Sequence, residues 1–246
     1  MQKKILGICF LWFAAILLHA ETKDATYRVC YGIFGQLGLS QAHLETHGDT
    51  YLIKVDAKTT GLVKKLSRNR QEAYLSRGHI VNGMLVSDTF DVQRSYAHKV
   101  TINRYLIDHK RKRVTKRVIK KKEGKILSDE TKILDFYSMD DLLTLYFNLP
   151  KRQDFSTPGT YTLTAVGAEK QDGRVKIVVP NSHETKRYEH TLGRGDFQYL
   201  TAIVYQKIFE SNKGELMLAI GKDGITQKAV LKDLILYGDL VAERIK

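Results

Sequence analysis

Histidines and acidic residues at short spacing are the first candidates for chemistry in this sequence. His43 and His47 are four residues apart, a spacing that places two zinc ligands on one face of a helix. Leu44 follows the first histidine, where a zinc peptidase would have glutamate, and Gly48-Asp49 predicts a strand that runs into a turn. Because residues four apart on a strand are separated by about 13 Å, we do not expect this pair to share a metal ion.

Two further acidic sets have the composition of ligand or catalytic groups. We predict that His183-Glu184 and Glu189-His190 lie on and beside a strand, which would direct the members of each pair to opposite faces. Asp140-Asp141 opens an apolar helical stripe, and neighbouring residues of a helix diverge by about 100°. We interpret these two acids as first-turn residues that favour the helix dipole. The sequence also contains no nucleophile elbow and no phosphate-binding loop, so it favours a non-enzymatic protein without metal or cofactor.

A basic run from Lys99 to Lys125 is the strongest charge feature, with twelve lysines and arginines against Asp108 and Glu123. It is interpreted either as a solvated edge hairpin, where lysines prevent aggregation, or as a surface for anionic lipids or an acidic protein. Nucleic acid is disfavoured, because no nucleic-acid-binding module is present and the chain is predicted to be exported. The candidate residues for an anionic surface are Lys110, Arg111, Lys112, Arg113, Lys116, Arg117, Lys120, Lys121 and Lys122.

The first twenty residues have the order of a secretory signal peptide. Lys3 and Lys4 precede the uncharged apolar stretch Ile5–Leu18, and Ala20 provides a small residue for cleavage. This stretch is shorter than the roughly 20 residues that span a bilayer, so no transmembrane span is expected after cleavage. An uncleaved anchor and lipidation of Cys9 are the alternatives. We expect Cys30, then the only cysteine, to be a buried thiol or to form an intermolecular disulfide.

The rest of the chain, residues 21–246, is expected to form a single β-rich domain. Of the 246 residues, 43% are apolar and 27% are charged, with a formal net charge of +13, which excludes both a disordered tail and a membrane-embedded bundle. Turns such as Asn82-Gly83 and Asp223-Gly224 separate the strand-like runs, and consecutive hairpins make neighbouring strands antiparallel. The predicted strands are Tyr27–Phe34, Gly38–Thr46, Tyr51–Lys58, Gln71–Val81, Met84–Val92, Lys99–Asp108, Arg113–Lys121, Gly159–Gly167, Arg174–Pro180, Thr185–Leu192, Thr201–Phe209, Glu215–Ile220 and Gln227–Leu236.

Two segments have helical periodicity instead. They are Gly61–Arg68 and Ser138–Leu149; in the second, Ser138 is the expected cap and Pro150 the expected stop. An amphipathic helix of this length is suited to cover the inner face of a curved sheet. We therefore predict a mainly β fold, a curved antiparallel sheet or partly open barrel with one or two short helices packed on it. A closed barrel is the alternative.

Several short sequence segments of the chain resemble those of a known family. Tyr27–Gly38, Ala57–Val63, Tyr74–Gly78 and the closing stretch Gly224–Asp239 are similar to the exported bacterial proteins of domain of unknown function 3108. The resemblance implies an exported, β-rich protein of the periplasm, shaped like the curved-sheet lipoprotein carriers. It supplies no catalytic residues.

Our functional prediction is a periplasmic protein of the cell envelope that binds a lipid or another hydrophobic component in a groove of the curved sheet. The alternative is an interaction protein that docks its basic hairpin on an anionic surface or acidic partner. The candidate groove residues, for which ordinary core packing is the competing interpretation, are Leu62, Val63, Leu66, Leu142, Leu145, Tyr146 and Leu149.

Overall fold

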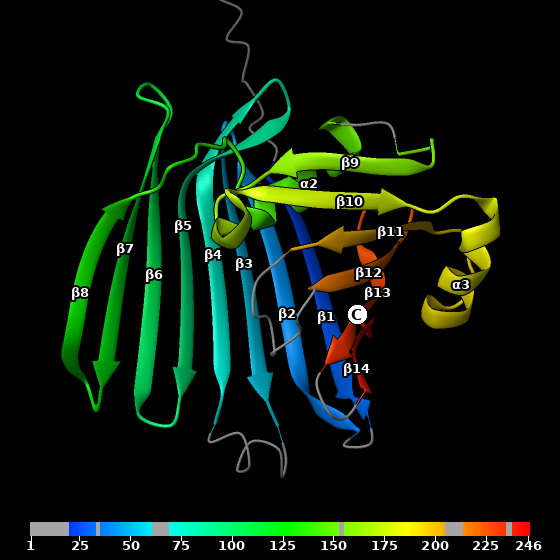
Figure 1. Cartoon of the computed structure of the whole chain (residues 1–246), viewed down its shortest axis with the longest axis horizontal. Helices are drawn as coiled ribbons and strands as arrows, with labels where there is room; N and C mark the ends of the chain where they lie inside the picture. The colour runs from blue at the N-terminus through cyan, green and yellow to red at the C-terminus, as the bar shows by residue number, and fades with distance from the viewer. Residues whose placement is uncertain (1–19, 33–34, 61–68, 153–154, 205–213, 235–237) are drawn as a thin grey trace, which may run out of the picture.

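The protein is built on one antiparallel sheet of fourteen strands, as seen in a computed structural model (Figure 1). The structure describes residues 20–32, 35–60, 69–152, 155–204, 214–234 and 238–246. The strands are β1 (Glu21–Tyr31), β2 (Gln36–His47), β3 (Thr50–Thr59), β4 (Gln71–Val81), β5 (Met84–Tyr96), β6 (Lys99–Asp108), β7 (Arg113–Lys122), β8 (Lys125–Ile133), β9 (Gly159–Thr164), β10 (Arg174–Val179), β11 (Gln198–Ile203), β12 (Glu215–Ile220), β13 (Thr226–Leu234) and β14 (Gly238–Arg244).

The sheet consists of two meanders that meet at the two ends of the chain. Strands β1 to β8 follow one another on one side and β14 to β9 on the other, so that β1 pairs with β14 in the middle. Their register runs from Tyr27 opposite Arg244 to Tyr31 opposite Leu240. The prediction of a curved antiparallel sheet is thus confirmed. The sheet is open rather than a closed barrel, because β8 and β9 are its two edges.

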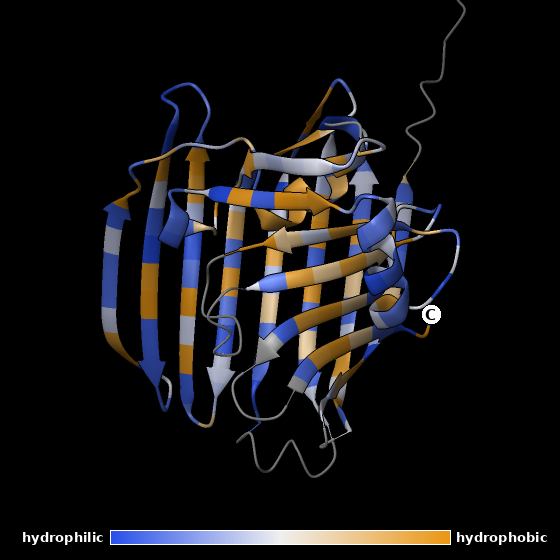
Figure 2. Ribbon diagram, turned by 45° about the vertical axis from the view of Figure 1, so that its right-hand side comes forward, coloured by the Kyte–Doolittle hydropathy of each residue, from blue (hydrophilic) through white to orange (hydrophobic). Residues whose placement is uncertain are grey.

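Two layers arise because the C-terminal meander folds over the N-terminal one. In Figure 1 the long strands β1 to β8 stand side by side, and β9 to β12 cross in front of them with α2 (Leu142–Arg152) between the layers. Orange and blue residues alternate along many strands in Figure 2, the pattern of strands with one apolar face. Among the described residues, no helix is both long and apolar enough to cross a membrane.

Helix α2 joins the two layers because it has apolar side chains on two faces. Leu145 and Leu149, both under 5% exposed, pack in a cluster with residues of β10, β11 and β12. Leu143 and Phe147 pack instead against a cluster that contains Ile53 of β3. The interior is therefore filled by the helix along most of its length.

The start and end of α2 differ from the prediction. Asp141, rather than Ser138, caps the helix, since the amides of Leu143 and Thr144 donate to its Oδ1 at 2.7 and 3.0 Å. Pro150 lies inside the helix instead of ending it. Near the C-terminal end a proline removes only one intrahelical hydrogen bond, and the ion pair of Arg152 with Asp140 holds the last turn.

The prediction of a strand at Thr185–Leu192 is wrong, because this segment belongs to helix α3 (Ser182–Leu192). Asn181 accepts hydrogen bonds from the amides of His183 and Glu184, and the Glu184 carboxylate accepts one from the Asn181 amide. This capping box overrides the weak strand pattern. The buried Tyr188 and Leu192 then face the sheet.

Two strands were not predicted, namely β8 and β14. The other strands agree with the prediction to within a few residues, except that β1 begins at Glu21, β5 continues to Tyr96 and β11 ends at Ile203. The predicted strand Thr201–Phe209 extends further, but its residues 205–209 lie outside the described part of the chain. The predicted helix Gly61–Arg68 and the signal peptide up to residue 19 lie outside the described residues. Cys30 is a partly buried free thiol in β1.

Candidate functional site

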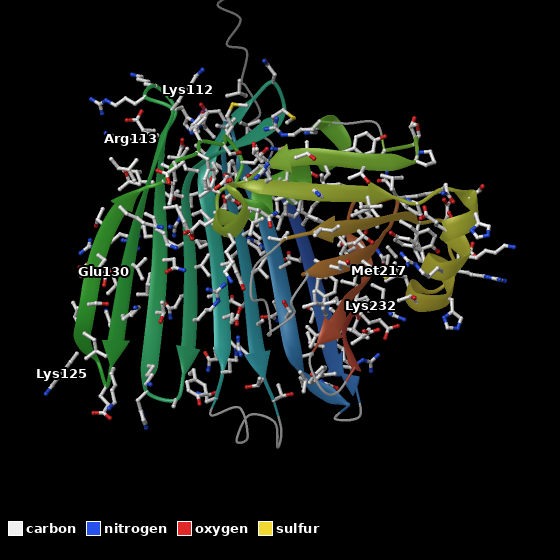
Figure 3. The ribbon with its side chains drawn as sticks, viewed as in Figure 1. Lys112, Arg113, Lys125, Glu130, Met217 and Lys232 are labelled. Atoms are coloured by element: carbon white, nitrogen blue, oxygen red, sulfur yellow. The ribbon has the colours of Figure 1, made fainter. Side chains whose placement is uncertain are left out.

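A large open pocket, called here the hairpin-tip pocket, has a volume of about 900 Å³. It lies between the tip of the β4–β5 hairpin, the β6–β7 turn, the end of α2 and strand β9. Figure 3 shows Lys112, one of its lining residues, at the end of the β6–β7 hairpin. A volume of this size is in the range of small-molecule sites.

A strap of four residues, Ser138–Asp141, is stretched between the two meanders, and its first three residues form the floor of the pocket. On one side the amide of Ser87 in β5 donates to the carbonyl of Met139 at 2.9 Å. On the other side the amide of Val166, just after β9, donates to the carbonyl of Asp140 at 2.7 Å. The strap is therefore fixed by main-chain hydrogen bonds, and it presents the side chain of Met139, which is 44% exposed.

Asp140 anchors the end of α2 beneath the pocket. Its carboxylate accepts from Asn148 Nδ2 at 2.7 Å and pairs with the Arg152 guanidinium at 2.6 Å. Burial raises the pKa of Asp140, although Arg152 and Asn148 act in the opposite direction. The Nε of Arg152 is buried and, within the described part of the chain, has no hydrogen-bond partner. Arg152 and Asp140 thus line the pocket wall as an ion pair.

Asp141 is directed away from the pocket and ties α2 to the sheet. Its Oδ2 accepts from the hydroxyls of Ser87, at 2.6 Å, and Ser76, which also contacts the Tyr51 hydroxyl at 2.9 Å. Burial raises the pKa of Asp141, against the effect of these hydrogen bonds. The two adjacent acids interpreted as first-turn residues are therefore both buried, and they have different partners.

A chain of polar side chains runs along one side of the pocket. Asp88 contacts His79 Nδ1 at 3.0 Å and His109 Nε2 at 3.2 Å through its two carboxylate oxygens. His109 Nδ1 lies 2.9 Å from the Tyr137 hydroxyl, and the two imidazole rings stack edge to face at 5.6 Å. Val81, Met84 and Val86 from the hairpin tip provide the apolar side of the same pocket.

These pocket residues were not identified from the sequence. His79 and His109 are thirty positions apart, and only the antiparallel pairing of β4, β5 and β6 brings them together. Arg152 stands beyond the proline that was expected to end the helix. The sequence did contain one indication of this site, the pair Asp140-Asp141 before an apolar helix. One of the two acids caps the helix and the other forms a buried ion pair with Arg152.

The predicted groove residues lie elsewhere. Leu145 and Leu149 are core residues, and Leu142 and Tyr146 are partly buried against the core. The Tyr146 hydroxyl lies 3.1 Å from the carbonyl oxygen of Gly224, to which it donates, and 3.0 Å from Thr226 Oγ1. The remaining groove candidates, Leu62, Val63 and Leu66, fall outside the described residues. Among the described residues, Leu142 of the helix lines a pocket of about 320 Å³, and Val81, Met84 and Val86 line the hairpin-tip pocket.

The structure spreads the nine basic candidates over the whole length of β7. Lys110, Arg111, Lys112 and Arg113 lie at one end of the strand, whereas Lys120, Lys121 and Lys122 lie at the other end, beside Lys125 (Figure 3). Lys116 pairs with Glu169 at 2.6 Å in the interior, Arg117 with Asp129 at 2.5 Å and Arg111 with Asp108 at 3.2 Å. The run is therefore a charged sheet edge rather than one compact patch.

Three further histidines of the described residues lie apart from the hairpin-tip pocket. His43 of β2 lies 2.8 Å from Asp24 of β1. His183 and His190 lie on α3. In the part of the chain that the structure describes, no group of three or more His, Cys, Asp or Glu side chains is placed to hold a metal ion. A pocket of about 360 Å³ under α3 is lined partly by Met217 and Lys232 (Figure 3).

Comparison with known proteins supports the fold. No family model and no curated protein matches the sequence, so the resemblance to domain of unknown function 3108 stays a prediction. A solved structure is similar, the crystal structure of a beta-barrel-like protein of domain of unknown function DUF1849 from Brucella abortus. The similarity has a TM-score of 0.52 and 12% sequence identity, and it covers 94% of this chain and 97% of that chain. At this identity the likeness concerns the fold alone.

Proposed function

We propose that this is a non-enzymatic binding protein of the cell envelope that holds an amphiphilic molecule in the hairpin-tip pocket. The observation that carries the proposal is the combination of an apolar side, formed by Val81, Met84 and Met139, with a polar and cationic side in one open pocket of about 900 Å³. Val81 and Met139 are 46% and 44% exposed and lie together on the lining of this one pocket, where a ligand could cover both.

The polar side of the pocket indicates the head group of such a molecule. Lys112 provides a cation, whereas Arg152 is already paired with Asp140 of the same lining. His79, His109 and Tyr137 form a polar wall whose groups contact one another and Asp88. An anionic head, a carboxylate or a phosphate, is the group that these side chains would hold best. Methionines adapt their shape to varied apolar chains, which suits a carrier of lipids.

Export supports the same proposal from the sequence. The signal peptide of residues 1–20 and the resemblance to periplasmic proteins both favour the envelope, where amphiphiles are the material that needs a carrier. Native mass spectrometry of the mature protein, purified gently from a bacterial periplasm, is expected to show discrete extra mass that organic extraction releases and identifies as lipid.

The first prediction tests the apolar side of the pocket. Met139→Glu places a negative charge on the apolar floor of the pocket, so the affinity for the anionic fluorescent probe dansyl-undecanoic acid should fall about tenfold. Leu106→Glu is the matched control, because Leu106 is 57% exposed on β6 and does not line the pocket. Fluorescence titration measures the affinity of both variants and of the parent protein for the probe. Equal affinity of the two variants, or no saturable probe binding by the parent protein, would contradict the proposal.

The second prediction concerns the head group. Lys112 has a φ of +47°, a conformation that asparagine tolerates well, so Lys112→Asn removes the charge with little strain. This change should weaken dansyl-undecanoic acid several-fold, by about 1 kcal/mol, and leave the uncharged probe N-phenylnaphthylamine unaffected. Parallel loss of both probes would show that Lys112 acts through the fold and not through the anionic head.

A further inference from the structure

Strand β8 forms an exposed edge of the sheet that the proposed amphiphile site does not use. It pairs with β7 on one side and, among the described residues, with no strand on the other. Eight of its nine residues, Lys125–Ile133, are exposed. Figure 3 shows Lys125 and Glu130 of this strand at the outer edge of the sheet. Such an edge presents unpaired amide and carbonyl groups, and it is a template for an additional strand.

The register shows which backbone groups of β8 point outward. The amide of Leu134, which follows the strand, donates to the carbonyl of Val114 at 2.9 Å, so the backbone of Leu134 faces β7. Backbone groups alternate along an antiparallel strand, and Thr115 lies opposite Ile133 in a pair without mutual hydrogen bonds. The amides and carbonyls of Asp129, Thr131 and Ile133 therefore point away from β7, toward the open side.

Charge decides what kind of strand this edge accepts. The segment from Lys99 to Ile133, strands β6 to β8 with their turns, contains thirteen lysines and arginines against four aspartates and glutamates, a net charge of +9 in a chain of net +13. Strand β8 itself has two lysines against Asp129 and Glu130, so the positive charge comes from β6, β7 and the turns beside it. A second copy of the same edge is repelled by this charge, which protects the protein from edge-to-edge aggregation. An acidic segment is attracted by the same charge. The positive charge therefore disfavours a second copy of this edge and favours an acidic strand.

The side chains of β8 define the two faces of the incoming strand. Lys132 is 61% exposed and turns to the inner face, where it lies 3.8 Å from Glu169. Thr131 and Ile133 alternate with it and lie on the outer face, with Ile133 57% exposed. Glu130 lies on the inner face with Lys132, and Asp129 lies on the outer face with Thr131 and Ile133. A partner strand with an acidic side chain beside Lys132 and an aliphatic side chain beside Ile133 is therefore complementary at this end of β8.

We propose that β8 accepts an extended acidic segment of another protein as an additional strand of the sheet. The main-chain groups of Asp129, Thr131 and Ile133 provide the hydrogen bonds, as in other proteins that bind peptides by strand addition. The net positive charge of β6 to β8 provides selectivity and a fast encounter. The interaction is independent of the hairpin-tip pocket.

The test uses the full mature protein and a labelled peptide of alternating glutamate and valine, with the length of β8, nine residues. Fluorescence anisotropy should show saturable binding that weakens as salt rises from about 50 mM to 500 mM, whereas a lysine–valine peptide should not bind. Thr131→Pro removes one outward amide without touching the β7 ladder, and it should weaken the glutamate–valine peptide about tenfold. Thr131→Val, which keeps the amide, is the matched control.

Hydrogen exchange gives a second readout that does not depend on a variant. Peptide binding should slow amide exchange at Asp129, Thr131 and Ile133 and leave the Leu134 amide, already bonded to Val114, unchanged. No binding of the glutamate–valine peptide, or binding that Thr131→Pro does not change, would overturn strand addition. Binding to anionic phospholipid vesicles that is equally strong in Thr131→Pro, without peptide binding, would assign the basic edge to a membrane surface instead.

Discussion

At the scale of single residues, the buried carboxylates determine how the site is held together. Asp141 accepts from two amides at the start of α2 and from the hydroxyls of Ser76 and Ser87. Asp141→Ala leaves all four donors without their acceptor, so the free energy of unfolding should fall by about 3 kcal/mol. Urea denaturation measures this loss. Glu130→Ala, a change at an exposed position of β8, should have little effect, and an equal loss in both variants would contradict the role given to Asp141.

Glu72 provides the pH dependence that can be predicted at the same scale. Burial alone would raise the pKa of its carboxyl group, but hydrogen bonds from Tyr74 and Arg70 and the charges of Arg70 and Arg94 outweigh burial and lower it. A carboxyl group with a lowered folded pKa stabilises the fold above its unfolded pKa, and this stabilisation is lost as the pH falls through the folded pKa. Urea midpoints of the parent protein and Glu72→Gln should therefore differ most near pH 6 and converge below the lowered pKa. A difference that is constant with pH would exclude this ionisation.

At the scale of elements, the capping box of α3 is the interaction that makes residues Ser182–Leu192 a helix and not the strand that was predicted there. Asn181→Ala removes the acceptor for two amides, at 2.9 and 3.0 Å, and should lower the free energy of unfolding by about 1 kcal/mol. Asn181→Asp keeps an acceptor oxygen and is the matched control. Urea denaturation of both variants tests the assignment, which fails if the alanine and aspartate variants lose the same stability.

The elements also show what the sequence could predict and why. Hairpins with explicit turns, such as Asn82-Gly83 with its two positive φ angles, were predicted because the turn chemistry is local. Strand β8 was missed because it is exposed on both faces, so no apolar alternation marks it. The hairpin-tip pocket was missed for a different reason. Its histidines and Arg152 meet only through the register of non-local strands and through a helix that continues past Pro150.

At the scale of the whole molecule, the position of a strand in the sheet decides what a substitution does. Ala242 lies in β14, where it faces Val29 on one side and Ala229 on the other, so the pairing of the two meanders passes through it. A proline there removes a ladder hydrogen bond at the centre of the sheet and should destabilise the protein by about 3 kcal/mol or more. Thr131→Pro on the edge strand removes only an outward amide and should melt like the parent protein.

Thermal denaturation followed by circular dichroism compares these two proline variants directly. A soluble, normally folded Ala242→Pro protein would mean that the two meanders fold without the β1–β14 pairing. A Thr131→Pro protein that fails to fold would mean that β8 is not a free edge. The expected result is that the same substitution unfolds the centre of the sheet and leaves its edge intact, because only the edge has backbone groups to offer to a partner.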